Sequence, residues 1–102
     1  MSLQNLKAVI YDKRGKVLSI GQNSYYKTHP LQAYYAKKAG QEGRIFLHAE
    51  ISAIIKCPDL DRAHKMMISR FGSDGRPLLA KPCPVCETAI RSTSIKHVDY
   101  TF

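Results

Sequence analysis

Two short stretches decide the fold of this chain: HAEISAII at residues 48–55 and PCPVC at residues 82–86. The first stretch places its isoleucines on one face of a helix, which predicts a helix that begins at about His48 and ends near Cys57. The second stretch predicts a helix that begins within the motif and continues to about Ser94. Each motif therefore stands at the start of a helix.

Short strands are expected on either side of these helices. Two β-rich runs around a glycine-containing turn predict a hairpin, and the strands before and after the second helix should pair in parallel through a right-handed crossover. The expected strands are 6–11, 17–21, 65–71 and 95–100, and a further short helix is expected over 31–39. The chain should thus form an α/β sandwich of two or three layers, with a mixed sheet of about four strands in the order β-β-α-β-α-β.

Length and composition narrow the class of protein. The chain has 102 residues, 44% of them hydrophobic, so residues 1–102 are expected to form one domain with an ordinary core. Sixteen Lys and Arg residues against eight Asp and Glu residues give a net charge of +8, which favours nucleotides, nucleic acid or acidic surfaces as partners. No apolar run approaches the roughly 20 residues that cross a bilayer, so we expect no membrane partner and a cytoplasmic protein.

The two motifs together predict a zinc site. Cys83 and Cys86 are three residues apart and can face one ion from the first turn of a helix, where the helix dipole favours thiolates. His48 and Glu50 can face the same ion only if His48 lies at the helix entrance, where the backbone is not yet helical. One His and two Cys leave a fourth position on Zn²⁺ open for water, and Glu50 would move protons beside it.

Two plainer interpretations of these residues remain open. The zinc could be purely structural, with Cys57, His29 or His64 as its fourth ligand. Alternatively, Cys83 and Cys86 could form a redox pair.

The chain resembles the cytidine and deoxycytidylate deaminase superfamily, which includes tRNA adenosine deaminases, and within it the small phage-like members. The order His-x-Glu followed by Pro-Cys-x-x-Cys is the signature of zinc-dependent nucleobase deaminases. The resemblance follows the element order over nearly the whole chain and is specific around residues 21–23, 48–55 and 82–100. Members of the superfamily continue into a fifth strand and another helix, so the fold is expected to be shortened at its C-terminus, with a homo-oligomer completing the pocket.

The resemblance also implies substrate contacts. It assigns the sugar of the substrate to Asn23 and the edge of the base to the backbone of Ala49. The segment 24–46 matches no named part of the superfamily, and its charge makes Lys27, His29 and Arg44 candidates for a phosphate.

These observations predict a hydrolase that deaminates a nucleobase, with cytosine in a free nucleotide or nucleoside as the favoured substrate. One alternative is a deaminase of polynucleotides, acting on cytosine in single-stranded DNA or on adenosine in tRNA, because the charge and several tyrosines suit a nucleic-acid strand. A second alternative is a non-catalytic zinc domain that binds nucleic acid or protein. The base, the sugar and the phosphorylation state stay open at this level.

Overall fold

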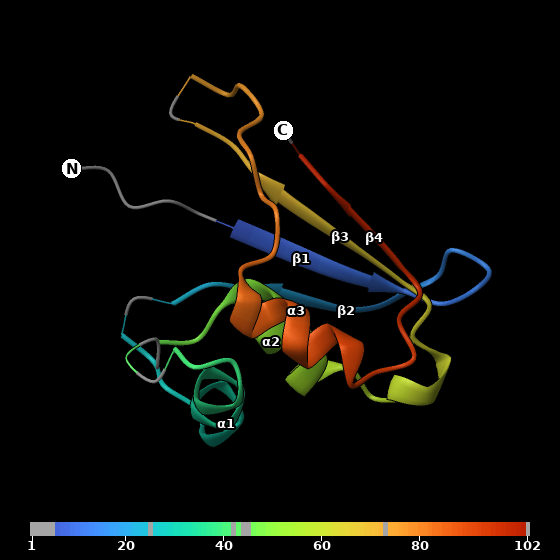
Figure 1. Cartoon of the computed structure of the whole chain (residues 1–102). Helices are drawn as coiled ribbons and strands as arrows, with labels where there is room; N and C mark the ends of the chain where they lie inside the picture. Colours follow the sequence, from blue (N-terminus) through green and yellow to red (C-terminus); the bar gives the residue numbers. More distant parts are fainter. Residues whose placement is uncertain (1–5, 25, 42, 44–45, 73, 102) are drawn as a thin grey trace.

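The computed structural model describes residues 6–24, 26–41, 43, 46–72 and 74–101. Four strands form one mixed sheet in the order β2-β1-β3-β4 (Figure 1). β1 pairs antiparallel with both β2 and β3, and β4 pairs parallel with β3. The strands are β1 (Leu6–Tyr11), β2 (Val17–Gln22), β3 (Lys65–Arg70) and β4 (His97–Tyr100).

The helices α2 and α3 lie on one face of this sheet, and α1 lies beside them, farther from the strands (Figure 1). None of the helices in the described part of the chain combines the length and apolar character needed to cross a bilayer. The helices are α1 (Pro30–Lys38), α2 (Ala49–Lys56) and α3 (Pro84–Arg91), and a single 3-10 turn covers Leu60–Arg62.

The structure confirms the expected α/β class, the hairpin and the parallel pair formed through a helix. The short helix expected over 31–39 is present as α1, but the predicted order is incomplete, because it leaves this helix out between the hairpin and α2. α3 is also shorter than predicted and ends at Arg91. There the hydroxyls of Ser92 and Thr93 donate to the carbonyl oxygens of Ala89 and Ile90, at 2.6 Å each, and satisfy the end of the helix.

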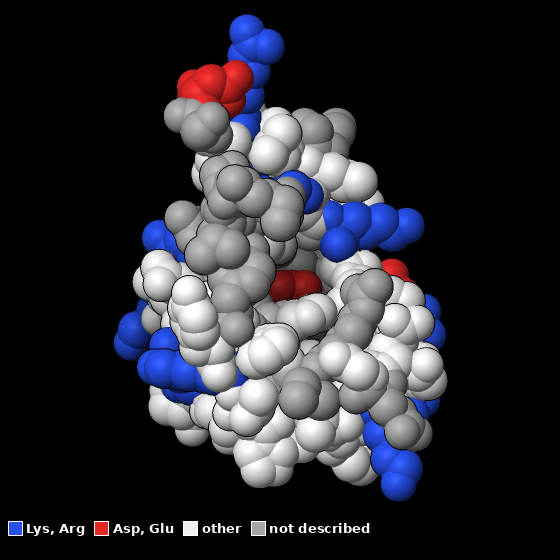
Figure 2. All heavy atoms as spheres, turned by 90° about the vertical axis from the view of Figure 1, so that its left-hand side faces the viewer, with Lys and Arg blue, Asp and Glu red and all other residues white. Residues whose placement is uncertain are grey.

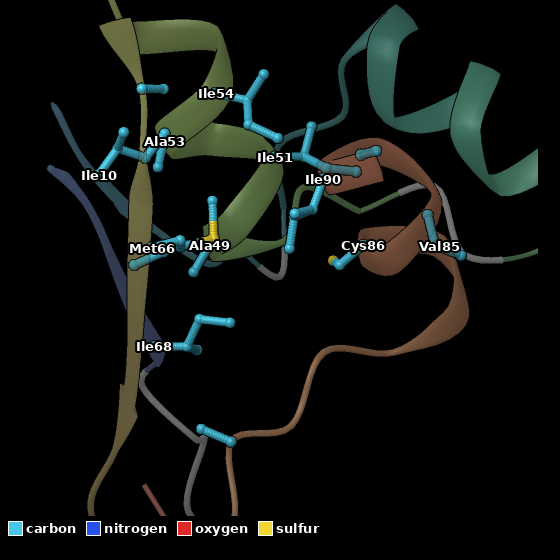
Figure 3. Close-up of a cluster of buried hydrophobic side chains, with 14 of the residues drawn as sticks. Ile10, Ala49, Ile51, Ala53, Ile54, Met66, Ile68, Val85, Cys86 and Ile90 are labelled. Carbon is cyan, nitrogen blue, oxygen red and sulfur yellow. The ribbon is translucent and has the colours of Figure 1, made fainter. Parts of the chain in front are cut away.

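The core forms where the even-numbered residues of β1 and β3 meet α2 and α3 (Figure 3). Strand alternation turns one side chain in two toward the helices, so Ile10 and Ile68 are fully buried. Ile51 of α2 and Val85 of α3 close the layer from the other side and are also fully buried. Removing each such side chain from water contributes about 1.5–3 kcal/mol, so the position of both helices is fixed mainly by this layer.

β2 brings the backbone of α2 unusually close to the sheet. The two buried residues of β2, Ser19 and Gly21, are both small, and the hydroxyl of Ser19 donates a buried 2.8 Å hydrogen bond to the carbonyl oxygen of Ala53. A Cβ atom placed on Gly21 would lie 2.8 Å from Ala53 Cα, and closer still to Ala53 N and to the carbonyl oxygen of Ala49. Glycine at this position is therefore what allows α2 to lie against the strand.

Replacing Gly21 with Ala should destabilise the protein by about 1–3 kcal/mol, because the added methyl group meets helix backbone that cannot rotate away. Thermal unfolding of Gly21→Ala against the wild type measures this effect. Gly43→Ala is the matched control, since a Cβ there meets nothing within 4 Å. Equal melting temperatures for the two variants would contradict the close approach.

Candidate metal centre

His48 stands at the N-cap of α2, with an extended backbone at φ −84° and ψ 155°. This conformation lets its ring face the same site as Glu50, two residues later, as the sequence predicted. The residue is held in place from α1, where the fully buried Gln32 accepts a 3.1 Å hydrogen bond from His48 N through Oε1. The helix that the predicted order omitted thus fixes the start of α2.

Cys83 takes the corresponding position in α3. It is the N-cap, with φ −73° and ψ 167°, and Pro84 begins the helix with a nitrogen that needs no partner. Cys86 lies one turn into α3 and is fully buried. The starts of two helices therefore meet, and each contributes to a single cluster of side chains.

The three predicted ligands come together in this cluster. His48 Nδ1 lies 3.2 Å from Cys86 Sγ and 3.4 Å from Cys83 Sγ, and all three ligand atoms lie within 4.8 Å of one another. Ligands of a tetrahedral Zn²⁺ at about 2.0–2.3 Å from the ion are separated by roughly 3.5–3.8 Å. Two thiols and an imidazole are also the donor set that zinc prefers, so the residues fit a zinc ion.

The described residues offer this cluster no fourth protein ligand. His29 instead caps α1, where its Nδ1 accepts a 3.0 Å hydrogen bond from Leu31 N. The ring of His64 stacks edge-on against His97 at 5.0 Å between ring centres, and Cys57 ends α2. Within the described ranges the geometry is therefore that of a three-ligand site with its fourth position free of protein ligands.

The cluster is also electrostatically prepared for a cation. A hydrogen bond from the Cys86 thiol lowers the pKa of Cys83, and His48 lowers it further. Sharing that proton with Cys83, together with burial, raises the pKa of Cys86. Cys83 is therefore the thiol that ionises more readily, and a metal ion bound here would favour the thiolate form of both sulfurs.

Glu50 lies beside the cluster in the first turn of α2 and is only 4% exposed. Burial raises the pKa of its carboxyl group, against the opposing effects of Cys86 and His48. A carboxyl group with a raised pKa exchanges protons nearer to neutral pH, as an acid-base group requires. Glu50 is thereby suited to the role that the sequence predicted for it.

A cavity of about 560 Å³ opens onto this cluster. Figure 2 shows acidic atoms at the bottom of a hollow, and Glu50 is the one acidic residue among the described residues that line the cavity. The other lining residues that matter for the chemistry are His48, Ala49, Cys83 and Asn23.

The structure places the predicted substrate-binding residues in two groups. Asn23 and Ala49 line the cavity together with the cluster. Asn23 is held by β1, because Leu6 N donates to its Oδ1 at 2.9 Å and Asn23 N donates to the carbonyl oxygen of Leu6 at 3.3 Å. Lys27 and His29 are not among the described lining residues, and Arg44 lies outside the described part of the chain.

Three residues of the site were missed by the sequence analysis: Gln32, Arg70 and Lys81. Arg70 and Lys81 line the cavity, and Gln32 positions His48. For Arg70 a signal was available, because it continues the alternation of Met66 and Ile68 and so belongs to the buried face of β3. No local pattern marks Gln32, whose partner is 16 residues away.

The fold and the cluster agree with the comparison of the chain with known protein families. Residues 3–102 match the family described as the cytidine and deoxycytidylate deaminase zinc-binding region, and the chain therefore belongs to this family. No curated protein matches the chain significantly.

The protein should bind one Zn²⁺ per chain, and Cys83→Ser should reduce the zinc content to well below one, because a serine hydroxyl is not ionised at neutral pH. Elemental analysis after dialysis measures this content. Cys57→Ser is the matched control, since both cysteines are half-buried and Cys57 lies outside the cluster. One zinc ion per chain in Cys83→Ser would show that the metal is held elsewhere.

Proposed function

We propose that this protein is a zinc-dependent hydrolytic deaminase that converts cytosine to uracil in a free nucleotide or nucleoside. The observation that carries the proposal is the open three-ligand cluster, with the buried carboxyl group of Glu50 beside it at the bottom of a cavity. Membership of the deaminase zinc-binding family supports the same chemistry.

His48, Cys83 and Cys86 would hold the ion. When bound there, Zn²⁺ supplies the Lewis acidity that makes water nucleophilic near neutral pH. The half-buried Cys83, the buried Cys86 and the imidazole of His48 keep the site compact, and the three-ligand arrangement leaves room for substrate on the cavity side.

Glu50 performs the proton transfers. Its carboxylate accepts a proton from the attacking water and delivers it to the ring nitrogen N3 of cytosine, while the oxygen adds at C4. It then carries the second proton of that water to the amino group, and the bond between C4 and nitrogen breaks. The products are uracil and ammonia, so one water is consumed for each ammonia released. The raised pKa of Glu50 suits a group that must both accept and donate protons.

The remaining cavity residues orient the substrate. We assign the sugar to Asn23, whose amide group is fixed by the hydrogen bond from Leu6 N, and the edge of the base to the backbone of Ala49. Asn23 directly follows β2 and is hydrogen-bonded to β1, and Ala49 is the first residue of α2, which limits the movement of the base relative to Glu50.

Glu50→Gln should abolish ammonia release from cytosine compounds by a factor of at least about 10³ while leaving the zinc content at one per chain. The amide has nearly the shape of the carboxyl group but cannot carry protons. Glu87→Gln, in the first turn of α3 but not among the described residues that line the cavity, is the matched control and should retain activity. Full activity in Glu50→Gln would refute the mechanism, and a zinc-loaded wild type that releases no ammonia would favour a non-catalytic binding domain.

A second candidate function is deamination within a polynucleotide. Phe46 lines the cavity and is 47% exposed, and Tyr26, in the segment that runs beside it, is 84% exposed. Exposed aromatic rings next to a deaminase pocket can stack on unpaired bases, and the net charge of +8 suits a phosphate backbone.

Salt dependence separates the two candidates. A polynucleotide substrate makes several phosphate contacts, so kcat/KM for a single-stranded oligonucleotide should fall by about 10-fold or more between 50 and 200 mM salt. A free nucleotide makes a single phosphate contact and should show a shallow dependence. Turnover of the oligonucleotide alone, with a steep loss in salt, would replace the free-nucleotide proposal by this one.

A further inference from the structure

Two basic side chains line the same cavity as Glu50, and the mechanism above uses neither of them. Arg70 is the last residue of β3, and Lys81 precedes the Pro-Cys motif that begins α3. β3 ends at the cavity and the Pro-Cys motif begins there, so Arg70 and Lys81, which are 11 positions apart in the sequence, line the same cavity. Figure 2 shows basic side chains next to the hollow that contains the acidic atoms.

Arg70 is held in a defined position but is not fully partnered. One of its terminal nitrogens, NH1, donates a 3.2 Å hydrogen bond to the carbonyl oxygen of Leu79. Its Nε is buried and has no hydrogen-bond partner among the described residues. A buried N–H group without a partner is rare, so the described residues do not fully satisfy this guanidinium group, and the residue still lines the cavity.

No acidic side chain in the described part of the chain forms an ion pair with Arg70 or Lys81. The ion pairs among the described residues join other groups: Arg62 with Asp12, Lys65 with Asp99 and Arg76 with Asp74. Glu50 is the one described acidic residue that lines the cavity, and the mechanism requires its carboxyl group for proton transfer. The cavity therefore offers an anion two cationic groups in addition to the metal ligands.

The fold places Arg70 on the other side of β1 from Asn23, the residue assigned to the sugar, and both line the cavity. Leu6 of β1 lies directly opposite Arg70 in the antiparallel pair, and the same Leu6 exchanges two hydrogen bonds with Asn23. A sugar held at Asn23 thus has the guanidinium group of the neighbouring strand within the same cavity wall.

We propose that Arg70 and Lys81 bind the 5′-phosphate of the substrate, which is therefore a nucleoside monophosphate rather than a nucleoside. This inference rests on the proposed deaminase function and specifies its substrate class. The guanidinium group donates to phosphate oxygens through its terminal N–H groups, and the Lys81 ammonium group supplies a second positive charge.

Kinetics on matched substrates tests this proposal. The ratio of kcat/KM for deoxycytidine 5′-monophosphate to that for deoxycytidine should be well above one in the zinc-loaded wild type. It should fall by about 10–100-fold in Arg70→Gln and in Lys81→Ala. Arg70→Lys should restore only part of the ratio, because it keeps the charge but loses the paired donors. Arg76→Gln, on an exposed loop outside the cavity, is the matched control and should leave the ratio unchanged.

Binding of inorganic phosphate provides a readout that does not depend on catalysis. In ¹⁵N NMR spectra, the Nε–H resonance of Arg70 is identified by its loss in Arg70→Gln. It should shift and saturate as inorganic phosphate is added to the zinc-loaded Glu50→Gln variant, and Lys81→Ala should weaken this binding. Folding of every variant is checked by the dispersion of its backbone amide spectrum.

The outcomes distinguish the two proposals. Phosphate binding that depends on Arg70 and Lys81, without ammonia release from any cytosine compound, would retain the anion site and refute the deaminase function. Equal turnover of nucleoside and monophosphate in the wild type, with no phosphate-induced shift at Arg70, would refute the anion site and retain the deaminase. Turnover of a single-stranded oligonucleotide that depends on Arg70, without preference for the monophosphate, would refute the monophosphate as the substrate.

Discussion

The close contact between α2 and β2 is the constraint on which the site depends. Because Gly21 has no side chain and Ser19 forms a hydrogen bond with Ala53, the helix lies directly on the sheet rather than at the usual distance of two interlocking side-chain layers. The start of α2 is thereby fixed in depth relative to the strands. The distance of His48 and Glu50 from the sheet is therefore fixed as well. The apolar layer between the sheet and α3 places the two cysteines beside them.

Much of this arrangement could be predicted from the sequence because its signals are local. The spacing of Cys83 and Cys86, the position of His48 before an amphipathic helix and the turn of the hairpin each lie within a few residues. Packing then converts these local patterns into a single cluster. The approximate ends of β1, β2 and β3 were also predictable, since each is a short β-rich run, whereas β4 begins two residues later than predicted.

The remaining features depend on contacts between distant parts of the chain. Gln32 reaches His48 from α1, a helix whose weak amphipathic pattern gave no reason to connect it with the site. Arg70 and Lys81 belong to the cavity only because β3 ends where α3 begins, which is a property of the crossover and not of either segment. His29 illustrates the opposite case. Its position in a basic segment suggested that it binds phosphate, but its side chain caps α1. Charge in a sequence indicates what a residue can bind, whereas the fold decides what it can reach.

The separation of the three ligands along the chain has a consequence for folding. His48 and Cys83 are 35 residues apart, and the segment between them contains α2, all of β3 and the loop that returns to α3. An ion held by both ends would act as a cross-link that closes this segment into a loop and removes conformational entropy from the unfolded chain. β3, one of the two central strands of the sheet, would then lie within a closed loop of the chain. The same ion that supplies the chemistry of the site would thus reduce the conformational entropy that is lost when β1 and β4 pair with β3.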